Sequence, residues 1–225
     1  MILLRIAIDG PAGAGKSTVA RIVAQKLGYT HIDTGAMYRA LTLEALERSI
    51  DLENQDALVA ALEDMDLTLQ PGSAGNQVFI QGRDVTAQIR SPEVSEHVSL
   101  VSSHPKVRAA VVEMQQQMAK ADNVVMDGRD IGTVVMPDAD LKIYLDASVE
   151  VRAMRRSMEL AKKGFPVSLE ELVAKIRQRD EFDSTREASP LRQAEDAVVI
   201  DTTNLSVSEV VDLILAYCRG RGGHV

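Results

Sequence analysis

This sequence of 225 residues has a single cysteine and no long apolar run. The one cysteine, Cys218, excludes an internal disulfide, and a reducing cytoplasm fits that composition best. No stretch approaches the roughly 18 apolar residues that a membrane span requires. The apolar run in the opening MILLRIAIDG is too short for a signal peptide and is interrupted by Arg5. We therefore expect a cytoplasmic protein with no membrane partner.

Positive charge is also in short supply, because 25 Lys and Arg stand against 33 Asp and Glu, for a net charge of −8. A nucleic acid polymer would be repelled by that average, so DNA and RNA are not expected as partners. The basic residues are mainly arginines, whose planar guanidinium suits bidentate contact with phosphate or carboxylate. Most of them are expected to be solvated surface charges, so only arginines grouped by spacing indicate a site.

Short apolar runs that end in aspartate alternate with helical patterns along the chain. Leu3–Asp9 is expected to be a strand, and Thr30–Asp33 a short strand or an extended segment. Three more runs predict buried parallel strands: Val124–Asp127, Leu141–Asp146 and Val198–Asp201. Helices are expected at about residues 16–27, 35–48, 54–64, 148–163, 168–184 and 206–219, and two more begin at Pro92 and Pro105. Residues 67–86 alternate with period two around PGSAGN, which predicts an antiparallel hairpin. The expected fold class is α/β, a parallel sheet with helices on both faces.

The chain is long enough for one substantial domain with an insertion. We expect a single domain over residues 1–225, whose core is formed by about 1–35, 101–151 and 187–225. An insertion at about 36–100 carries the hairpin, and about 152–186 forms a short lid with its flanking helices. Within that lid, AKKGFPVS (Ala161–Ser168) is a loop with Gly and Pro that is suited to closing over a ligand.

The segment IAIDGPAGAGKST gives the strongest functional signal. It contains G-x-x-x-x-G-K-[ST] directly after a predicted strand and at the start of a predicted helix. In this phosphate-binding loop (P-loop), backbone N–H groups wrap a phosphate, Lys16 reaches the β- and γ-phosphates, and Ser17 can bind Mg²⁺. A nucleoside triphosphate is therefore expected to bind Gly10, Pro11, Ala12, Gly13, Ala14, Gly15, Lys16, Ser17 and Thr18. The N-K-x-D and D-x-x-G patterns of GTPases do not occur in the sequence.

Arginines grouped by spacing suggest a second, anionic substrate. Arg152, Arg155 and Arg156 are spaced i, i+3 and i+4 on a predicted helix, so they are expected to share a face. Three positive charges on one face repel each other unless an anion joins them. The alternative is a solvated face on which they pair with Glu150 and Glu159.

Two further groups point to the same second site. Arg179, Asp183 and Arg186 share a helix face, where a ladder of intrahelical ion pairs is the alternative. MDGRDIGT (Met126–Thr133) presents Arg129 and Asp130 in a tight turn after a strand. Asp127, which ends that strand, is either a carboxylate on the magnesium side of the site or an aspartate that caps its own turn. DTGAMYR brings Thr34 and Arg39 near the carboxyl edge of the sheet, where open α/β sheets bind their ligands.

These segments together resemble the bacterial cytidylate (CMP) kinases, which are P-loop kinases of nucleoside monophosphates. The resemblance rests on IDGPAGAGKST, DTGAMYR, DGRDIGT, PDADLKIYLDAS, RxxRR at Arg152–Arg156 and RDEFDSTR, in that order. It runs from about residue 2 to about residue 217, and DGRDIGT combined with RDxxDxxR is far more specific than the loop motif alone. The hairpin fits the enlarged monophosphate-binding insertion of the bacterial family. The resemblance implies phosphorylation of CMP and dCMP by ATP, with Mg²⁺ as the cofactor, and we expect a monomer.

The resemblance also implies roles for individual residues. Thr34 and Arg39 would face the monophosphate, together with Arg129 and Arg186, while Arg179 and Asp183 would lie near the sugar and Ser99, Arg108 and Asp130 near the base. The residues implied to act on the transferring phosphate are Lys16, Arg129, Arg152, Arg155 and Arg156. Ser17 would hold Mg²⁺, with Asp127 contributing through water.

The implied reaction needs little proton chemistry. A CMP phosphate oxygen attacks the γ-phosphorus in line, and since that oxygen is already anionic, no general base is required. The four histidines, which show no metal-ligand spacing, are interpreted as structural or exposed: His31, His97, His104 and His224. Two alternatives stay open. A kinase of the same fold would show ADP release with a different acceptor, and a nucleotide-binding regulatory module would hydrolyse ATP slowly without any acceptor.

Overall fold

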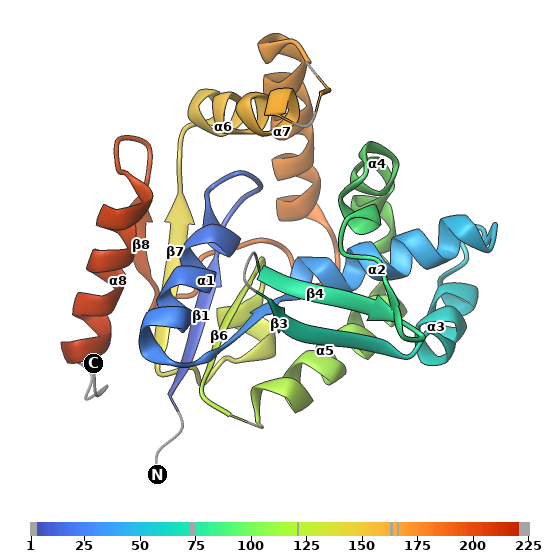
Figure 1. The fold of residues 1–225 in the computed structure, drawn as a ribbon, viewed down its shortest axis with the longest axis horizontal. Coiled ribbons are helices and arrows are strands. Elements are labelled where there is room, and N and C mark those ends of the chain that lie inside the picture. Colours follow the sequence, from blue (N-terminus) through green and yellow to red (C-terminus); the bar gives the residue numbers. More distant parts are fainter. Residues whose placement is uncertain (1–3, 73–74, 121, 163, 166, 221–225) are drawn as a thin grey trace.

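The structure is a computed structural model that describes residues 4–72, 75–120, 122–162, 164–165 and 167–220 (Figure 1). Parts of the sequence-based expectations fall outside these described residues: Leu3, Ser73, Ala74, Lys163, Pro166 and His224. Among the helices that are described, none is long and apolar enough to cross a membrane.

A parallel sheet of five strands forms the centre of the molecule. Its strands are β1 (Arg5–Asp9), β2 (Thr30–Asp33), β6 (Val124–Gly128), β7 (Leu141–Asp146) and β8 (Val198–Asp201), in the order β2-β6-β1-β7-β8. The strands are the short apolar runs that the sequence marks, and β1 and β6 are almost wholly buried. In the register of the sheet, Asp127 lies beside both Ile8 and Asp33, so the aspartates that end these strands gather at one edge.

Alternate residues of the strands face two different helical layers. Ile6 and Ile8 of β1 pack with α1 (Lys16–Leu27) and α8 (Val207–Gly220). Ala7 packs instead with α5 (Pro105–Ala119) and with the single helical turn η2 (Ile131–Val135). Because successive side chains of a strand point to opposite faces, these two layers cover the two sides of the sheet. The expected α/β fold is confirmed.

The segment between β2 and α5 forms a layer with its own apolar core. Its elements are α2 (Thr34–Glu47), α3 (Gln55–Asp64), β3 (Leu67–Gly72), β4 (Gly75–Ile80), β5 (Arg83–Asp84), η1 (Gln88–Arg90) and α4 (Pro92–Val101). The predicted hairpin is present as β3 and β4, and the short β5 extends it to an antiparallel sheet of three strands. The side chain of Asp33 accepts from the N–H of Ala36 at 3.1 Å, so α2 begins at Thr34.

The last unit consists of α6 (Val149–Lys162) and α7 (Leu169–Thr185). These helices pack against each other through a small cluster around Ala153, Leu172 and Ile176. Figure 1 shows both helices lying beyond the carboxyl end of β7, at the edge where the strand-ending aspartates gather. The helices that carry the arginine groups therefore stand over the edge of the sheet at which ligands are expected.

Candidate active site

The loop from Gly10 to Gly15 joins β1 to α1 and has a backbone that only glycine permits at two positions. Gly10 has φ of 144°, and a Cβ there would lie 1.9 Å from the carbonyl oxygen of Leu145. Gly13 has φ of 80°, and its Cβ would lie 3.1 Å from Cβ of Arg152. Gly15 precedes α1 without any side-chain cap, so the first N–H groups of that helix are left for an anion. The geometry is that of a phosphate-binding loop.

Lys16 folds back onto this loop. Its Nζ donates to the carbonyl oxygen of Pro11 at 2.8 Å, and the residue is only 6% exposed. Burial lowers the pKa of Lys16 to about 7, and the nearby Arg129 guanidinium lowers it further. An incoming phosphate would supply the negative charge that favours the protonated amine, so this side chain is poised for an anionic ligand.

Asp127 connects the loop to the neighbouring strand. Ser17 Oγ donates to Asp127 Oδ2 at 2.6 Å, and His31 Nε2 lies 2.8 Å from Asp127 Oδ1. Burial by itself raises the pKa of Asp127, but the hydrogen bonds from His31 and Ser17 and the charge of Lys16 outweigh it, and the pKa lies below its usual range. Asp127 is therefore an ionised carboxylate facing the P-loop, and it does not serve merely as a cap of its own turn.

The donor atoms at this point fit a hard divalent cation. Mg²⁺ prefers oxygen ligands and takes only one or two from a protein when substrate phosphates supply others. Ser17 provides a hydroxyl and Asp127 an ionised carboxylate, 2.6 Å apart and beside the loop. In the described part of the chain, no group of three or more His, Cys, Asp or Glu side chains could hold a metal ion alone. The donor set suits a cation that arrives with a nucleotide.

A cluster of arginines surrounds Asp183 of α7. Arg129 Nε donates to Asp183 Oδ2 at 2.9 Å, and guanidinium nitrogens of Arg179 and Arg186 each lie 3.9 Å from a carboxylate oxygen. Three cations thus share one anion. Burial lowers the pKa of Arg179 to about 10, the charge of Arg129 lowers it further, and Asp183 and Asp180 oppose the shift. The intrahelical ladder expected as the alternative exists, and Arg129 joins it from another element through its contact with Asp183.

Arg39 of α2 extends this positive region, and Thr34 lies at the start of the same helix. Thr34 Oγ1 donates to the carbonyl oxygen of Asp127 at 2.6 Å, which fixes the start of α2 against the end of β6. Arg39 donates to Ser95 Oγ of α4 at 2.9 Å. Burial lowers the pKa of Arg39 to about 9, and the charge of Arg179 adds to that shift. Both residues therefore lie at the edge of the site, on the side of the inserted layer.

A buried ion pair joins Arg108 of α5 to Asp130, and their side chains are only 3% and 6% exposed. Arg108 Nη1 also donates to the carbonyl oxygen of Ser102 at 3.1 Å, and its guanidinium lies 5.3 Å from the ring centroid of Tyr38. Ser99 lies one turn earlier than Ser102, whose hydroxyl donates to the Ser99 carbonyl. The structure therefore gathers Ser99, Arg108 and Asp130 in one region, with a carboxylate acceptor beside guanidinium donors.

The three arginines of α6 have different surroundings. Arg152 is buried against the P-loop, where its Nη1 donates to the carbonyl oxygen of Ala12 at 3.1 Å. Arg155 donates to the hydroxyl and the carbonyl oxygen of Thr202, at the end of β8. Arg156 pairs with Glu159 of its own helix at 2.7 Å. The expected single cluster is therefore not formed here, because Arg155 bonds to Thr202 and Arg156 pairs with Glu159.

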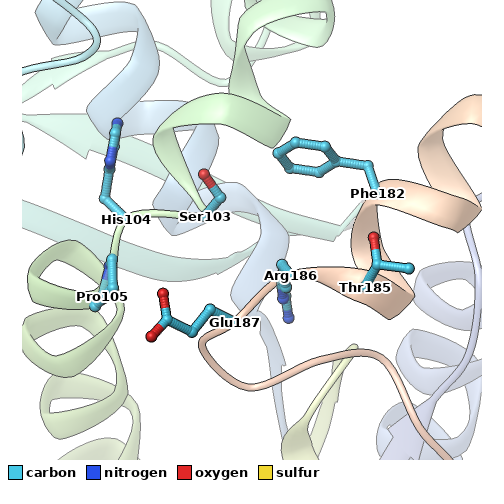
Figure 2. Close-up of a pocket in the computed structure, with 7 residues that line it drawn as sticks. All are labelled: Ser103, His104, Pro105, Phe182, Thr185, Arg186 and Glu187. Atoms are coloured by element: carbon cyan, nitrogen blue, oxygen red, sulfur yellow. The ribbon is translucent and has the colours of Figure 1, made fainter.

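A pocket of about 390 Å³ opens beside this region, between the α4–α5 connection and the end of α7 (Figure 2). It is lined by Ser103, His104, Pro105, Phe182, Thr185, Arg186 and Glu187. Arg186, which belongs to the cluster around Asp183, forms part of its wall. The pocket thus leads from the surface to the arginine cluster.

Several residues of the site were not identified from the sequence. His31 orients Asp127, Asp9 accepts from the N–H groups of Ile131 and Gly132 at 2.8 and 2.7 Å, and Asp180 pairs with Arg152. Asp9 and His31 lie in strands that end at the ligand edge, and Asp180 stands next to Arg179. A polar side chain in a strand that ends at the ligand edge is the sequence signal that could have identified Asp9 and His31.

Comparison with known proteins agrees with this geometry. Residues 6–220 match the family model described as cytidylate kinase. The cytidylate kinase of Carboxydothermus hydrogenoformans is 54% identical over 212 residues, which cover 94% of this chain and 96% of that protein. The cytidylate kinase of Geobacillus sp. (strain WCH70) is 54% identical over 220 residues, which cover 98% of each chain.

A solved structure is similar in fold alone. The shikimate kinase from Acinetobacter baumannii in complex with shikimate has a TM-score of 0.50 and 17% identity, over 98% of this chain and 95% of that chain. The α/β arrangement of sheet and helices is what the two proteins share.

Proposed function

Since the chain belongs to the cytidylate kinase family, we propose that it transfers the γ-phosphoryl group of ATP to the phosphate of CMP and of dCMP. An oxygen of the acceptor phosphate forms a bond to the γ-phosphorus while the bond from that phosphorus to the β,γ-bridging oxygen breaks. CDP or dCDP and ADP are the products. The attacking oxygen is already anionic, so positioning and electrostatic stabilisation supply the catalysis and no general base is needed.

One observation carries this proposal: the segment from Asp127 to Asp130 contacts three different parts of the site. It reaches the P-loop through Asp127 and Ser17 at 2.6 Å, α7 through Arg129 and Asp183 at 2.9 Å, and α5 through the ion pair of Asp130 and Arg108. These four consecutive residues therefore link the P-loop, which is suited to a triphosphate, to two other groups. One is the arginine cluster on α7, which is suited to a second anion, and the other is the Arg108–Asp130 pair, which is suited to a polar ring. Such a link supports direct transfer between two bound nucleotides, because it holds the two sites in fixed relation.

The residues divide into a donor side and an acceptor side. Gly10–Thr18 hold the ATP phosphates, and Lys16, when charged by its ligand, follows the γ-phosphoryl group during transfer. On the acceptor side, Thr34, Arg39, Arg129 and Arg186 bind the monophosphate, Arg179 and Asp183 bind the sugar, and Ser99, Arg108 and Asp130 bind the base. Arg152, Arg155 and Arg156 approach the transferring phosphate from α6. Lys16 and Arg186 are among the buried cations of the site, which supports an anionic ligand there, since a buried charge calls for a counterion.

Mg²⁺ is the proposed cofactor, held by Ser17 and, through water, by Asp127. When bound, it would neutralise charge on the β- and γ-phosphates. The chain's own part is to keep Asp127 ionised and oriented, which the contacts from His31 and Ser17 achieve.

A panel of acceptors tests the proposed function. The full chain is mixed with ATP and Mg²⁺, and ADP release is measured with CMP, dCMP, UMP, AMP, shikimate or no acceptor. Fast release with CMP and dCMP, and little with the others, is the expected result. Equal release with and without acceptors would instead identify a hydrolase, and preference for another acceptor would refute the assignment of the base site.

We further propose a cytoplasmic monomer in which residues 36–100 bind the monophosphate and residues 152–186 close over the nucleotides. Light scattering during size-exclusion chromatography tests the monomeric state, and a mass near the 24.5 kDa of one chain is expected. A mass of two chains would contradict it.

A further inference from the structure

Phe182 is an aromatic residue in an unusual setting. It lies on α7 between polar neighbours and is 39% exposed. It packs into none of the apolar clusters of the described residues, including the one that joins α6 to α7 around Ala153, Leu172 and Ile176. Other large apolar side chains are also exposed, among them Met158 and Tyr217, and what distinguishes Phe182 is that it lines a pocket.

The ring of Phe182 lines the pocket described above. Figure 2 shows it extending from α7 toward Ser103 on the opposite wall, with Arg186 below. A volume of about 390 Å³ lies within the range of small-molecule sites. The pocket therefore has an aromatic wall at Phe182, and its lining includes one cation and one carboxylate, Arg186 and Glu187.

The pocket adjoins the buried pair of Arg108 and Asp130. Arg108 donates to the carbonyl oxygen of Ser102, the residue before the pocket-lining Ser103. Arg186 also lies near that pair, since burial and the charge of Arg108 lower the pKa of Arg186 while Asp130 opposes the shift. A ring bound in this pocket would lie beside Phe182, against a wall that continues from Ser103 through Ser102 to Arg108.

The position of Phe182 on α7 agrees with this arrangement. Arg179 precedes it by three residues, Asp183 follows it directly, and Arg186 follows at i+4. These neighbours supply hydrogen-bond donors, an acceptor and charge, but no flat apolar surface. A nucleobase needs both kinds of contact, because its edges are polar and its faces are not.

We propose that Phe182 is the stacking surface for the pyrimidine ring of the acceptor nucleotide. The proposal rests on the proposed function, in which CMP occupies this site, and adds a base-binding residue to it. Stacking on an aromatic ring does not distinguish between bases, so Phe182 contributes affinity while Arg108 and Asp130 select the base. A matched loss of affinity for CMP and UMP is therefore expected when the ring is removed.

Fluorescence gives the first test, because the chain contains no tryptophan. Phe182→Trp introduces the sole indole, and its emission is followed during titration of the full chain with CMP in the absence of ATP. Saturable quenching by CMP is expected, with little or none by ribose 5-phosphate, which has the sugar and phosphate but no base. Tyr217→Trp is the control for absorption by cytosine, since Tyr217 lies on α8 and is 42% exposed.

Equal changes with CMP and ribose 5-phosphate would overturn the proposal, because they would report closure of the site and not contact with the base. Absence of quenching by CMP, under conditions where calorimetry detects CMP binding to the same variant, would overturn it as well.

Kinetics give the second test. Phe182→Leu keeps an apolar side chain but removes the π face, so KM for CMP and for UMP is expected to rise by about 5- to 20-fold, in line with base–aromatic stacking. KM for ATP and kcat at saturating CMP are expected to stay near the wild-type values. An unchanged KM for CMP would overturn the proposal.

Different results would contradict the proposed function and the stacking of a base on Phe182. If the wild-type chain makes no CDP, the proposed function fails, whereas the fluorescence titration still decides whether a pyrimidine stacks on residue 182. If the wild-type chain phosphorylates CMP and neither variant responds as described, the stacking proposal alone is wrong.

Discussion

Arg152 Nη1 lies 2.6 Å from Asp180 Oδ2, and the same side chain donates to the carbonyl oxygen of Ala12 in the P-loop. Its Nε donates to the carbonyl oxygen of Ala147 at 2.9 Å, so one guanidinium joins the P-loop, the start of α6 and the middle of α7. The side chain of Arg152 is 4% exposed and that of Asp180 is 22% exposed. This pair connects the donor half of the proposed site to the helix that carries the acceptor half.

Asp180→Asn is therefore expected to destabilise the protein. Arg152 would keep its buried charge and lose its counterion, a change that costs about 3–5 kcal/mol for a fully buried pair. Since Asp180 is partly exposed, a smaller loss of about 1–3 kcal/mol in the free energy of unfolding is expected here. Urea denaturation of the full chain at neutral pH measures it.

Glu150→Gln serves as the matched control, because Glu150 pairs with Arg177 on the same two helices but both side chains are more than 60% exposed. That change is expected to alter the free energy of unfolding by less than about 0.5 kcal/mol. Similar losses in the two variants would show that the Arg152–Asp180 contact has no special role.

Lys16→Ala is expected to lower kcat by about 100- to 1,000-fold while the fold is kept, as for removal of a transition-state contact worth about 2.7–4 kcal/mol. Lys16 is the P-loop side chain whose charge can follow the γ-phosphoryl group. Lys26→Ala, which removes an exposed lysine at the other end of α1, is the control. Stopped-flow measurement of ADP release gives kcat, and circular dichroism shows whether the fold is kept. A folded Lys16→Ala variant with kcat reduced by less than about threefold would refute the loop assignment.

Asp130→Asn tests recognition of the base edge. Cytosine presents an amino donor where uracil presents a carbonyl, and a carboxylate can only accept. A site that pairs a substrate N–H can reject the analogue that lacks it by ~10⁴-fold, less where water enters. The amide of Asn can turn either its donor or its acceptor inward, so kcat/KM for CMP is expected to fall and the ratio of CMP to UMP to narrow.

The control for that variant is Asp138→Asn, which breaks the exposed pair of Asp138 with Arg5. It is expected to leave the ratio of kcat/KM for CMP to that for UMP as in the wild type. An unchanged ratio in Asp130→Asn would remove Asp130 from base recognition and leave it the structural partner of Arg108.

The sequence predicted the fold well because its strands share one pattern. Each is a short apolar run that ends near aspartate, and such runs are buried parallel strands whose ends meet at one edge, as Asp33 and Asp127 do in the sheet. The order β2-β6-β1-β7-β8 could not be read in the same way, since the apolar runs are chemically alike and any two of them could pair. The third strand of the small sheet, β5, has only two residues and leaves no periodic signal.

Helical spacing predicted which residues share a face but not what they touch. Arg179, Asp183 and Arg186 come together as their spacing indicates. Arg155 and Arg156 each share a face with Arg152 by the same rule, yet Arg155 bonds to Thr202 and Arg156 pairs with Glu159. The contact of His31 with Asp127 joins residues 96 positions apart, which local patterns cannot reveal.

Asp9 gives the protein a dependence of stability on pH. Burial raises the pKa of Asp9 to about 6 from 3.8, although the N–H groups of Ile131 and Gly132 oppose the shift. Between these values the unfolded chain has released a proton that the native state keeps. The free energy of unfolding therefore falls as pH rises through this window, by up to about 1.4 kcal/mol per pH unit.

Asp9→Asn is expected to remove that slope, since the amide does not titrate. Urea denaturation of both proteins from about pH 4 to about pH 7 measures their free energies of unfolding. The wild-type value minus the Asp9→Asn value is expected to be largest at the acidic end and to decrease as the pH rises. Titrating groups that do not interact with Asp9 are present in both proteins and cancel, whereas the pKa of Lys16, which the charge of Asp9 raises, would fall in the variant. Curves that remain parallel across the window would contradict a raised pKa for Asp9.

The most direct test of ATP-dependent transfer to CMP follows the phosphorus atoms themselves. ATP, CMP, Mg²⁺ and the full chain are mixed, and ³¹P NMR records every phosphorus species over time. The resonances of CDP and ADP are expected to grow together, one CDP for each ADP, with no accumulation of inorganic phosphate. Inorganic phosphate formed in place of CDP, at a rate independent of CMP, would contradict direct transfer between two bound nucleotides.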